Sequence, residues 1–91
     1  MFSLQVFFVG NVQGVGFRWT VKRIATGFEV IGWVRNLPDG RVELQTTGEE
    51  SEVRAFIEAI GQSELRAHIR DQTEFTLPEP PRARGFEIRH D

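Results

Sequence analysis

The chain has 91 residues, 40% hydrophobic and 26% charged, a composition typical of one small globular domain rather than a disordered segment. It has no cysteine, which excludes a disulfide framework, a cysteine-ligated zinc site and thiol catalysis. Eleven basic and thirteen acidic residues give a net charge of −2, which argues against nucleic acid or an anionic membrane as the main partner. No apolar run reaches the ~18 residues that span a bilayer, and the N-terminal residues lack the features of a signal peptide. We therefore expect a single cytoplasmic domain over residues 1–91.

The hydrophobic pattern predicts seven elements in the order β-α-β-β-α-β-β. Residues 4–9 are rich in β-branched and aromatic side chains, which favours a buried strand, and residues 21–28 repeat apolar side chains at helical spacing. Strands at 30–34 and 41–46 flank the turn sequence LPDG and form a hairpin. A second amphipathic helix follows at 53–60, with Gly61 at its end, and further strands are expected at 68–75 and 86–89.

Each predicted helix has a single apolar stripe, so both helices should cover the same face of a sheet. The element order then predicts an α+β fold, a ferredoxin-like sandwich with one additional strand, in which the sheet is antiparallel. This fold serves many functions, so the function has to be read from a particular segment.

That segment is the loop at residues 10–18, GNVQGVGFR, which joins the first strand to the first helix. Its three glycines allow a tight turn that presents backbone amides inward, and the helix N-terminus adds free amides and a positive dipole end. Arg18 adds a forked cation that suits phosphate oxygens. The loop thus suits a phosphate, sulfate or carboxylate group, although a glycine-rich corner with a solvated Arg18 would give the same pattern. It lacks the lysine and hydroxyl residue of a nucleoside triphosphate loop.

Two blocks of the sequence resemble the acylphosphatase family. Residues 10–18 are similar to the family signature G-x-V-Q-G-V-x-F-R, and residues 32–43, GWVRNLPDGRVE, are similar to its second signature, G-W-V-[RK]-N-x-x-x-G-x-V. Arg18 and Asn36 lie 18 positions apart, the separation expected in that family. The resemblance covers essentially the whole chain, and two ordered blocks are far more specific than either block alone.

The resemblance implies a small enzyme that hydrolyses the carboxyl–phosphate bond of acyl phosphates. Arg18 would bind the phosphoryl group together with loop amides, and Asn36 would hold the attacking water. The residues that it places around the phosphate are Asn11, Val12, Gln13, Gly14, Val15, Gly16, Phe17 and Arg18. No metal ligand and no cofactor are expected, and the partner is a small-molecule acyl phosphate rather than nucleic acid or membrane, bound by a monomer.

The residues present agree with that chemistry. A carboxylate leaving group is a weak base, with a pKa of roughly 4, so it can depart without a strong general acid. Catalysis then reduces to positioning and to stabilising charge on phosphoryl oxygens. Asn36 is neutral, so it can orient a water molecule but cannot act as its base. An ordinary turn residue before LPDG is the alternative for this asparagine.

Two other functions remain open. The first is a non-catalytic anion-binding module, since a domain of this kind also forms the N-terminal part of a large hydrogenase-maturation protein; the short chain favours the free-standing enzyme. The second is RNA binding, because the RNA-recognition motif shares the element order. The aromatic–glycine segment of that motif would lie on the third strand, whereas here it follows the first.

Several single residues carry further expectations. Phe17 and Trp33 are expected in the core, and Trp19 either borders the site or packs on the surface. His68 and His90 match no metal spacing and receive no role. The sequence departs from the family pattern twice. Glu29 occupies a position where glycine usually ends the first helix, so either it is strained or Gly27 ends the helix earlier. Asn11 replaces a common basic residue, which predicts weaker phosphate affinity.

Overall fold

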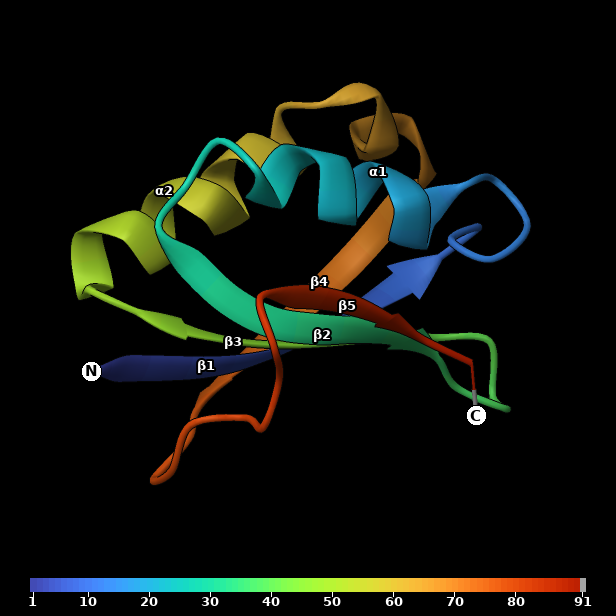
Figure 1. Ribbon diagram of the computed structural model, residues 1–91. Helices are drawn as coiled ribbons and strands as arrows, with labels where there is room; N and C mark the ends of the chain where they lie inside the picture. Colours follow the sequence, from blue (N-terminus) through green and yellow to red (C-terminus); the bar gives the residue numbers. More distant parts are fainter. Residues whose placement is uncertain (91) are drawn as a thin grey trace.

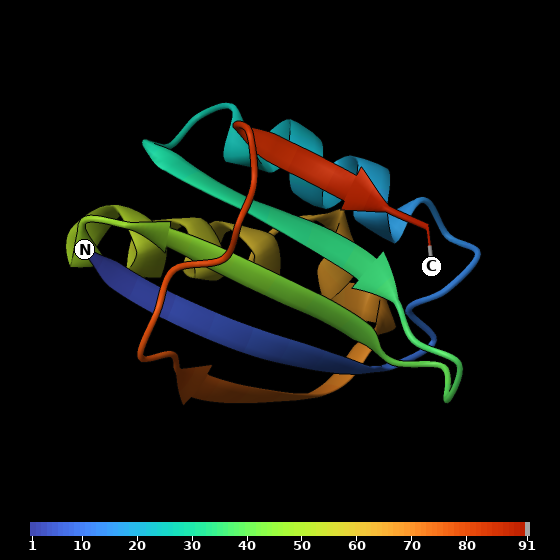
Figure 2. The same cartoon turned by 60° about the horizontal axis from the view of Figure 1, so that its bottom comes forward.

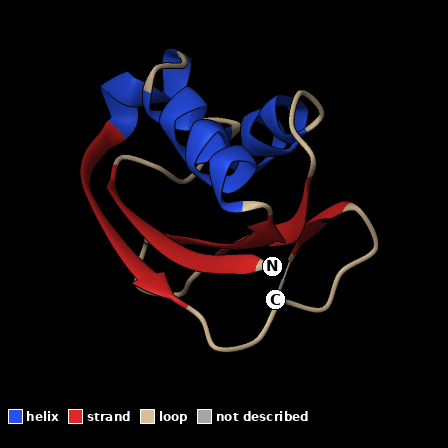
Figure 3. Cartoon of the chain, turned by 90° about the vertical axis from the view of Figure 1, so that its left-hand side faces the viewer, coloured by secondary structure: helices blue, strands red, loops and turns tan. Residues whose placement is uncertain are grey.

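Five strands form one sheet, and two helices cover one of its faces, in the computed structural model, which describes residues 1–90 (Figure 1). Viewed from the side, the helices lie together above the sheet and only loops lie below it (Figure 3). The elements are β1 (Phe2–Gly10), α1 (Phe17–Ala25), β2 (Val30–Asn36), β3 (Val42–Gly48), α2 (Glu50–Gly61), β4 (Ile69–Thr76) and β5 (Phe86–Arg89), with a short 3₁₀ helix, η1 (Glu64–His68), before β4. The predicted order of strands and helices is confirmed, and η1 replaces the expected start of β4 at His68.

The strand order across the sheet is β4-β1-β3-β2-β5. β1 pairs antiparallel with both β3 and β4, and β2 pairs antiparallel with β3. β5, however, runs parallel to β2, with Trp33 opposite Glu87 and Arg35 opposite Arg89. The expectation of a purely antiparallel sheet is therefore wrong for this edge, because the segment after β4 crosses the whole sheet before β5 begins (Figure 2). Because β2 and β5 run in the same direction, their C-terminal residues lie side by side at one end of the strands.

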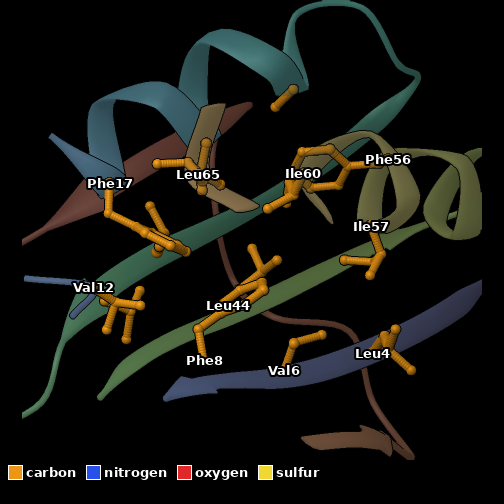
Figure 4. Packing of buried hydrophobic residues seen from close by; sticks show 14 of the residues in the cluster. Leu4, Val6, Phe8, Val12, Phe17, Leu44, Phe56, Ile57, Ile60 and Leu65 are labelled. Atoms are coloured by element: carbon orange, nitrogen blue, oxygen red, sulfur yellow. The ribbon is translucent and has the colours of Figure 1, made fainter. Parts of the chain in front are cut away.

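The core lies between the sheet and the helices and follows the period of two along the strands. Leu4, Val6 and Phe8 of β1 are almost fully buried, and their neighbours Val42 and Leu44 of β3 are fully buried. The two helices contribute apolar residues from one stripe each (Figure 4). The helical members of this cluster are Phe17, Val21 and Ala25 from α1 and Val53, Phe56, Ile57 and Ile60 from α2. The predicted amphipathic patterns thus identify the core faces of α1, α2 and β3.

The first helix ends at Ala25, earlier than its apolar pattern suggests. Phe28 lies beyond the helix and packs its ring against Phe56, with centroids 5.9 Å apart. Glu29 is not strained, since among residues 1–90 only glycines have positive φ, and its backbone amide donates to the Glu52 carboxylate at 2.8 Å. Of the two expectations for this region, the earlier helix end is the one that the structure supports.

The face of the sheet away from the helices carries a polar network around Glu43, which is 4% exposed. Gln5, Gln45 and Arg35 all donate to its carboxylate, at 2.7, 3.1 and 2.9 Å. Burial raises the pKa of Glu43, but these hydrogen bonds and the Arg35 charge outweigh it and hold the pKa below its usual value. Trp33 is buried on this face rather than in the core between sheet and helices, beneath the guanidinium groups of Arg35 and Arg89. The prediction of burial is confirmed for Trp33, and the location differs.

Candidate active site

Three segments that are far apart in the sequence meet at one edge of the sheet (Figure 2). They are the glycine-rich loop with the N-terminus of α1, the end of β2, and the end of β5. Between them lies a pocket of about 260 Å³. Its lining residues are Gly14, Gly16, Phe17, Arg18, Trp19, Asn36, Ile88 and His90. The topology, and above all the parallel pairing of β5, creates this meeting point.

The loop owes its shape to glycines. Gly14 has φ of 80° and Gly16 has φ of 74°, in the left-handed region that other residues enter only at a cost of about 1–2 kcal/mol. Gly10 serves a different purpose, because a Cβ at this position would lie 2.7 Å from the backbone nitrogen of Arg70 and closer still to the His68 carbonyl oxygen. Gly10 thus lets β1 pass close to β4, while Gly14 and Gly16 bend the loop around the pocket.

The N-terminus of α1 is left open to a ligand. Gly16 occupies the cap position and supplies no side-chain hydrogen bond, and the first turn contains no acidic residue. The Thr20 amide donates to the Gly16 carbonyl at 3.0 Å, so the amides of residues 17–19 precede the first helical hydrogen bond. Among residues 1–90, no backbone carbonyl accepts from the amides of Gly14 or Gly16 either. Free amides and an uncompensated positive helix end favour an anion in the pocket.

The loop is fastened to the protein on both sides of Gly14. Val12 is fully buried in the core, and the Phe17 ring packs on Phe8 with centroids 5.1 Å apart (Figure 4). The Gln13 side chain reaches across to the β2–β3 hairpin, where its amide group donates to the carbonyls of Leu37 and Arg41 at 2.8 and 3.0 Å. Gln13 therefore ties the loop to the turn of the hairpin, which begins directly after Asn36.

Arg18 extends from the first turn of α1 toward the end of β5. Its Nη1 donates to the Arg89 carbonyl at 3.0 Å and lies 3.2 Å from Nδ1 of His90. A guanidinium has no acceptor, so this contact is a hydrogen bond in the tautomer of His90 whose Nδ1 carries no proton. These two partners occupy one end of the guanidinium and hold it in place. Its remaining N–H groups stay available for two oxygens of an anion.

Asn36 is the last residue of β2 and lines the same pocket as Arg18, Gly14 and Gly16. It is paired with Val42 in the hairpin, so its backbone is fixed by the sheet. A carboxamide both donates and accepts hydrogen bonds, so it can hold a water molecule and direct it toward an anion in the pocket. The predicted pairing of Arg18 with Asn36 across one pocket agrees with this arrangement.

The other predicted loop residues divide into three groups. Gly14, Gly16 and Phe17 line the pocket, whereas the side chains of Val12 and Gln13 anchor the loop as described, and Val15 packs partly against the core. Asn11 lies away from the pocket, and its backbone amide donates to the His68 carbonyl at 3.0 Å. The structure thus does not bring the Asn11 amide to the site, and Asn11 is not among the residues that line the pocket.

Comparison with known proteins agrees with this geometry. The family model described as acylphosphatase matches residues 4–88. The chain belongs to the acylphosphatase family. It is 42% identical over 84 residues to the acylphosphatase of Haloarcula marismortui, covering 92% of this chain and 91% of that one. It is 34% identical over 91 residues to the acylphosphatase of Oceanobacillus iheyensis, covering 99% and 100%.

Solved structures show the same fold. The crystal structure of an acylphosphatase from Bacillus subtilis superimposes with a TM-score of 0.86 at 32% identity, over 97% of this chain and 98% of that one. HypF from T. kodakarensis also contains a region of this fold, with a TM-score of 0.83 at 33% identity, but the match covers only 12% of the HypF chain. Acylphosphatases are hydrolases, and the family match and the curated relatives place this chain among them.

Two features of the site were missed by sequence reasoning. His90 was given no role, yet it lines the pocket and contacts Arg18. Only the parallel pairing of β5 with β2 brings it there, and no local pattern signals that pairing. Gln13 was expected to contribute its backbone amide to the phosphate site, and nothing in the sequence indicated that its side chain donates to the hairpin carbonyls of Leu37 and Arg41. In the described part of the chain, no group of three or more His, Asp or Glu side chains is arranged to hold a metal ion. None of the helices there is long and apolar enough to cross a membrane.

Proposed function

We propose that this member of the acylphosphatase family hydrolyses acyl phosphates at the pocket between the glycine loop, Asn36 and the end of β5. The observation that carries the proposal is the convergence of Arg18, the uncapped N-terminus of α1 and Asn36 on one pocket. The phosphoryl group would lie against Arg18 and the free amides of Gly14, Gly16 and the first turn of α1. The Asn11 amide, which is already bonded, would not take part.

The reaction is a direct in-line displacement at phosphorus. The oxygen of a water held by Asn36 attacks phosphorus, and the bond from phosphorus to the acyl oxygen breaks. The electron pair of that bond leaves with the carboxylate, and the water's proton passes to a phosphate oxygen, so the products are a carboxylate and inorganic phosphate. The backbone amides and Arg18 stabilise the negative charge on the equatorial oxygens throughout.

The absence of a general base from this scheme follows from the residues around the pocket. Asn36 cannot remove a proton, the lining contains no carboxylate, and Nδ1 of its one histidine, His90, lies 3.2 Å from Nη1 of Arg18 rather than at a proton of the attacking water. The carboxylate leaving group needs no protonation, with a pKa of roughly 4 in the free acid. Arg18 and the amides supply the positive charge that a metal ion would otherwise bring, and on this ground we propose that the reaction does not require a metal. The cytoplasmic location and the monomeric state stay predictions.

The test is the hydrolysis of benzoyl phosphate by the wild type, Arg18→Ala, Arg18→Lys and Asn36→Ala, in the presence of a chelator. Losing one preorganised donor lowers kcat by about 10²–10³-fold, and Arg18→Ala removes more than one, so its activity should fall at least that far. Arg18→Lys should rescue little, because an ammonium group does not reproduce the fork. Asn36→Ala should lower kcat with little change in KM, since its partner is water. Wild-type protein that binds phosphate without hydrolysing benzoyl phosphate would instead support the anion-binding module.

A further inference from the structure

We propose that Trp19 and Ile88 form an acyl-binding wall of the pocket, and that this wall makes the chain favour aromatic acyl phosphates over small ones such as acetyl phosphate. The inference rests on the proposed function, since it assigns the half of the substrate that the phosphate contacts leave free. Both residues line the pocket. Neither side chain has a polar group that the proposed phosphate chemistry uses.

Trp19 is unusual because it is a large aromatic side chain that is 63% exposed, directly beside Arg18 in the first turn of α1. An exposed tryptophan leaves apolar surface in water, which is unfavourable by roughly 25 cal/mol for each Å². Single exposed apolar residues are common, so exposure alone decides nothing. Two further observations favour a binding role for Trp19. It lies at the rim of the proposed anion-binding pocket, and its ring has a neighbour that favours one orientation.

The Trp19 ring is held by neighbours that do not touch the pocket. The Arg23 guanidinium lies 5.7 Å from the ring centroid, one turn further along α1. Arg23 is in turn paired with Glu64 of η1 at 3.0 Å. These contacts favour the observed orientation of the Trp19 ring in the absence of a ligand. A ring that already favours one orientation loses less rotamer freedom when a ligand packs against it.

The pocket lining has two chemical halves. Gly14, Gly16, Arg18 and Asn36 supply amides, a cation and a carboxamide, whereas Trp19 and Ile88 supply apolar surface. Ile88 is partly buried and packs against the core, so its side of the wall is fixed by β5. A ligand with an anionic head and an apolar body matches these two halves. The pocket's 260 Å³ lies just below the ~300 Å³ at which pockets for drug-sized ligands begin, which fits a small molecule.

An aromatic acyl phosphate has this composition, because its ring can pack on Trp19 while the phosphoryl group lies at Arg18. Aromatic pairs add roughly 0.5–1.5 kcal/mol beyond burial, which corresponds to about a two- to twelvefold change in affinity. Acetyl phosphate presents a single methyl group and gains little from the same wall. The discrimination should therefore appear in KM and not in the chemical step.

The experiment measures kcat and KM for benzoyl phosphate and acetyl phosphate with wild type, Trp19→Ala, Trp19→Phe and Phe75→Ala. Trp19→Ala should raise KM for benzoyl phosphate about three- to tenfold and change kcat and the acetyl phosphate constants less than about twofold. Trp19→Phe keeps an aromatic face and should retain most of the preference. Phe75→Ala is the matched control, since it removes an aromatic ring that is 50% exposed on the opposite face of the sheet. Alanine is also the better helix former, so Trp19→Ala should fold.

The outcomes separate failure of the proposed function from failure of the acyl wall. If wild type hydrolyses neither substrate, the proposed function fails. If it hydrolyses both and Trp19→Ala leaves the ratio of their kcat/KM values unchanged, the acyl wall is refuted while the function stands. An equal loss for both substrates also refutes it, because Trp19 would then act through the phosphate loop. A macromolecular partner for Trp19 would give this same unchanged ratio.

Binding without turnover provides a second readout. Benzylphosphonate carries an aromatic ring and a phosphonate but no hydrolysable acyl bond. It should change the fluorescence of Trp19, whereas inorganic phosphate at saturation should change it much less. Trp19→Phe should abolish the benzylphosphonate signal, since the other tryptophan, Trp33, is buried on the far face of the sheet. A signal of the same size in Trp19→Phe would contradict the proposed wall.

Discussion

The contact between Gln13 and the hairpin makes a specific prediction about catalysis. Gln13 donates two hydrogen bonds from the glycine loop to the carbonyls of Leu37 and Arg41. Replacing it with alanine removes both bonds and leaves Val12 and Phe17 in the core. The loop would then be anchored only at its two ends, and the distance between the free amides and Asn36 would no longer be fixed.

The structure sets the size of the effect on stability. Both carbonyls keep another partner, since Leu37 accepts from the Gly40 amide and Arg41 accepts from the Leu37 amide. Gln13→Ala therefore leaves no buried acceptor unsatisfied, and the two lost bonds should cost about 1 kcal/mol in the free energy of unfolding. For a domain of this size that lowers Tm by about 4–8 °C. The loss in kcat should be about tenfold. A displacement of catalytic groups near 1 Å can lower the rate 10²-fold, and the loop, still held at both ends, should move by less than that.

The assay combines kcat and KM for benzoyl phosphate with thermal unfolding followed by circular dichroism. Gln72→Ala is a matched control, because Gln72 donates one side-chain hydrogen bond, to Glu74, on edge strand β4. KM should change less than kcat in Gln13→Ala, since Arg18 is held independently by the Arg89 carbonyl. Unchanged kcat together with the expected fall in Tm would refute the reasoning, because the tie would then serve stability alone.

Gln13→Glu sharpens the test through its pH dependence. A carboxylate cannot donate, and near neutral pH it would face two carbonyl oxygens, so the loss in kcat should exceed that of Gln13→Ala. The carbonyls disfavour the charged form and raise the pKa of the introduced carboxyl above its ordinary ~4.3. Protonation restores one donor, so activity relative to wild type should rise as the pH falls toward that pKa. If the activity of Gln13→Glu relative to wild type were independent of pH, the hydrogen bonds to the hairpin carbonyls would not matter for catalysis.

The remaining predictions concern stability. Glu43→Gln should cost about 2 kcal/mol and lower Tm by about 10 °C, because it removes hydrogen bonds to a buried charge, while KM for benzoyl phosphate stays unchanged. Folding lowers the pKa of Glu43, so its contribution to stability is fully present above the ordinary pKa of ~4.3 and is lost as the pH falls below that value. The free energies of unfolding of wild type and Glu43→Gln, measured in urea, should therefore converge as the pH falls from about 6 to 3. Gly10→Ala should cost about 3 kcal/mol, because its Cβ would overlap the His68 carbonyl. Gly14→Ala meets open space and should cost only the roughly 1–2 kcal/mol of its positive φ. Equal losses at the two glycines, measured by urea denaturation, would contradict this account.

Much of the fold could be predicted because it is encoded locally. The alternating apolar residues of β3 and the helical stripes of α1 and α2 each identify the face that meets the core, and the described structure buries those faces. The LPDG turn fixes the β2–β3 hairpin, which places Asn36 at a strand end. The glycines of the loop likewise predict an anion cradle, because left-handed backbone at Gly14 and Gly16 requires them.

The parts that could not be predicted depend on contacts between distant segments. β5 is only four residues long, and its direction relative to β2 is decided by the loop that crosses the sheet. His90 reaches Arg18 only through that pairing, over a sequence separation of 72 residues. The burial of Trp33 has the same origin, since Arg35 and Arg89 come from two strands and cover its ring together. The alternation of residues along a strand separates its two faces. It does not show that side chains from another strand will bury a residue on the face away from the helices, as they bury Trp33.

The site concentrates positive potential in a chain whose net charge is −2. It does so with one guanidinium and with main-chain groups, since the first turn of α1 has neither an acidic residue nor a capping side chain. Main-chain groups keep their charge distribution at every pH, so the cradle does not titrate, and only its shape has to be maintained. That shape rests on Val12 and Phe17 in the core and on Gln13 at the hairpin. Residues with no reactive group therefore determine whether the pocket forms, and this is why glycine spacing and core packing carry more information about function here than any pattern of acids and bases.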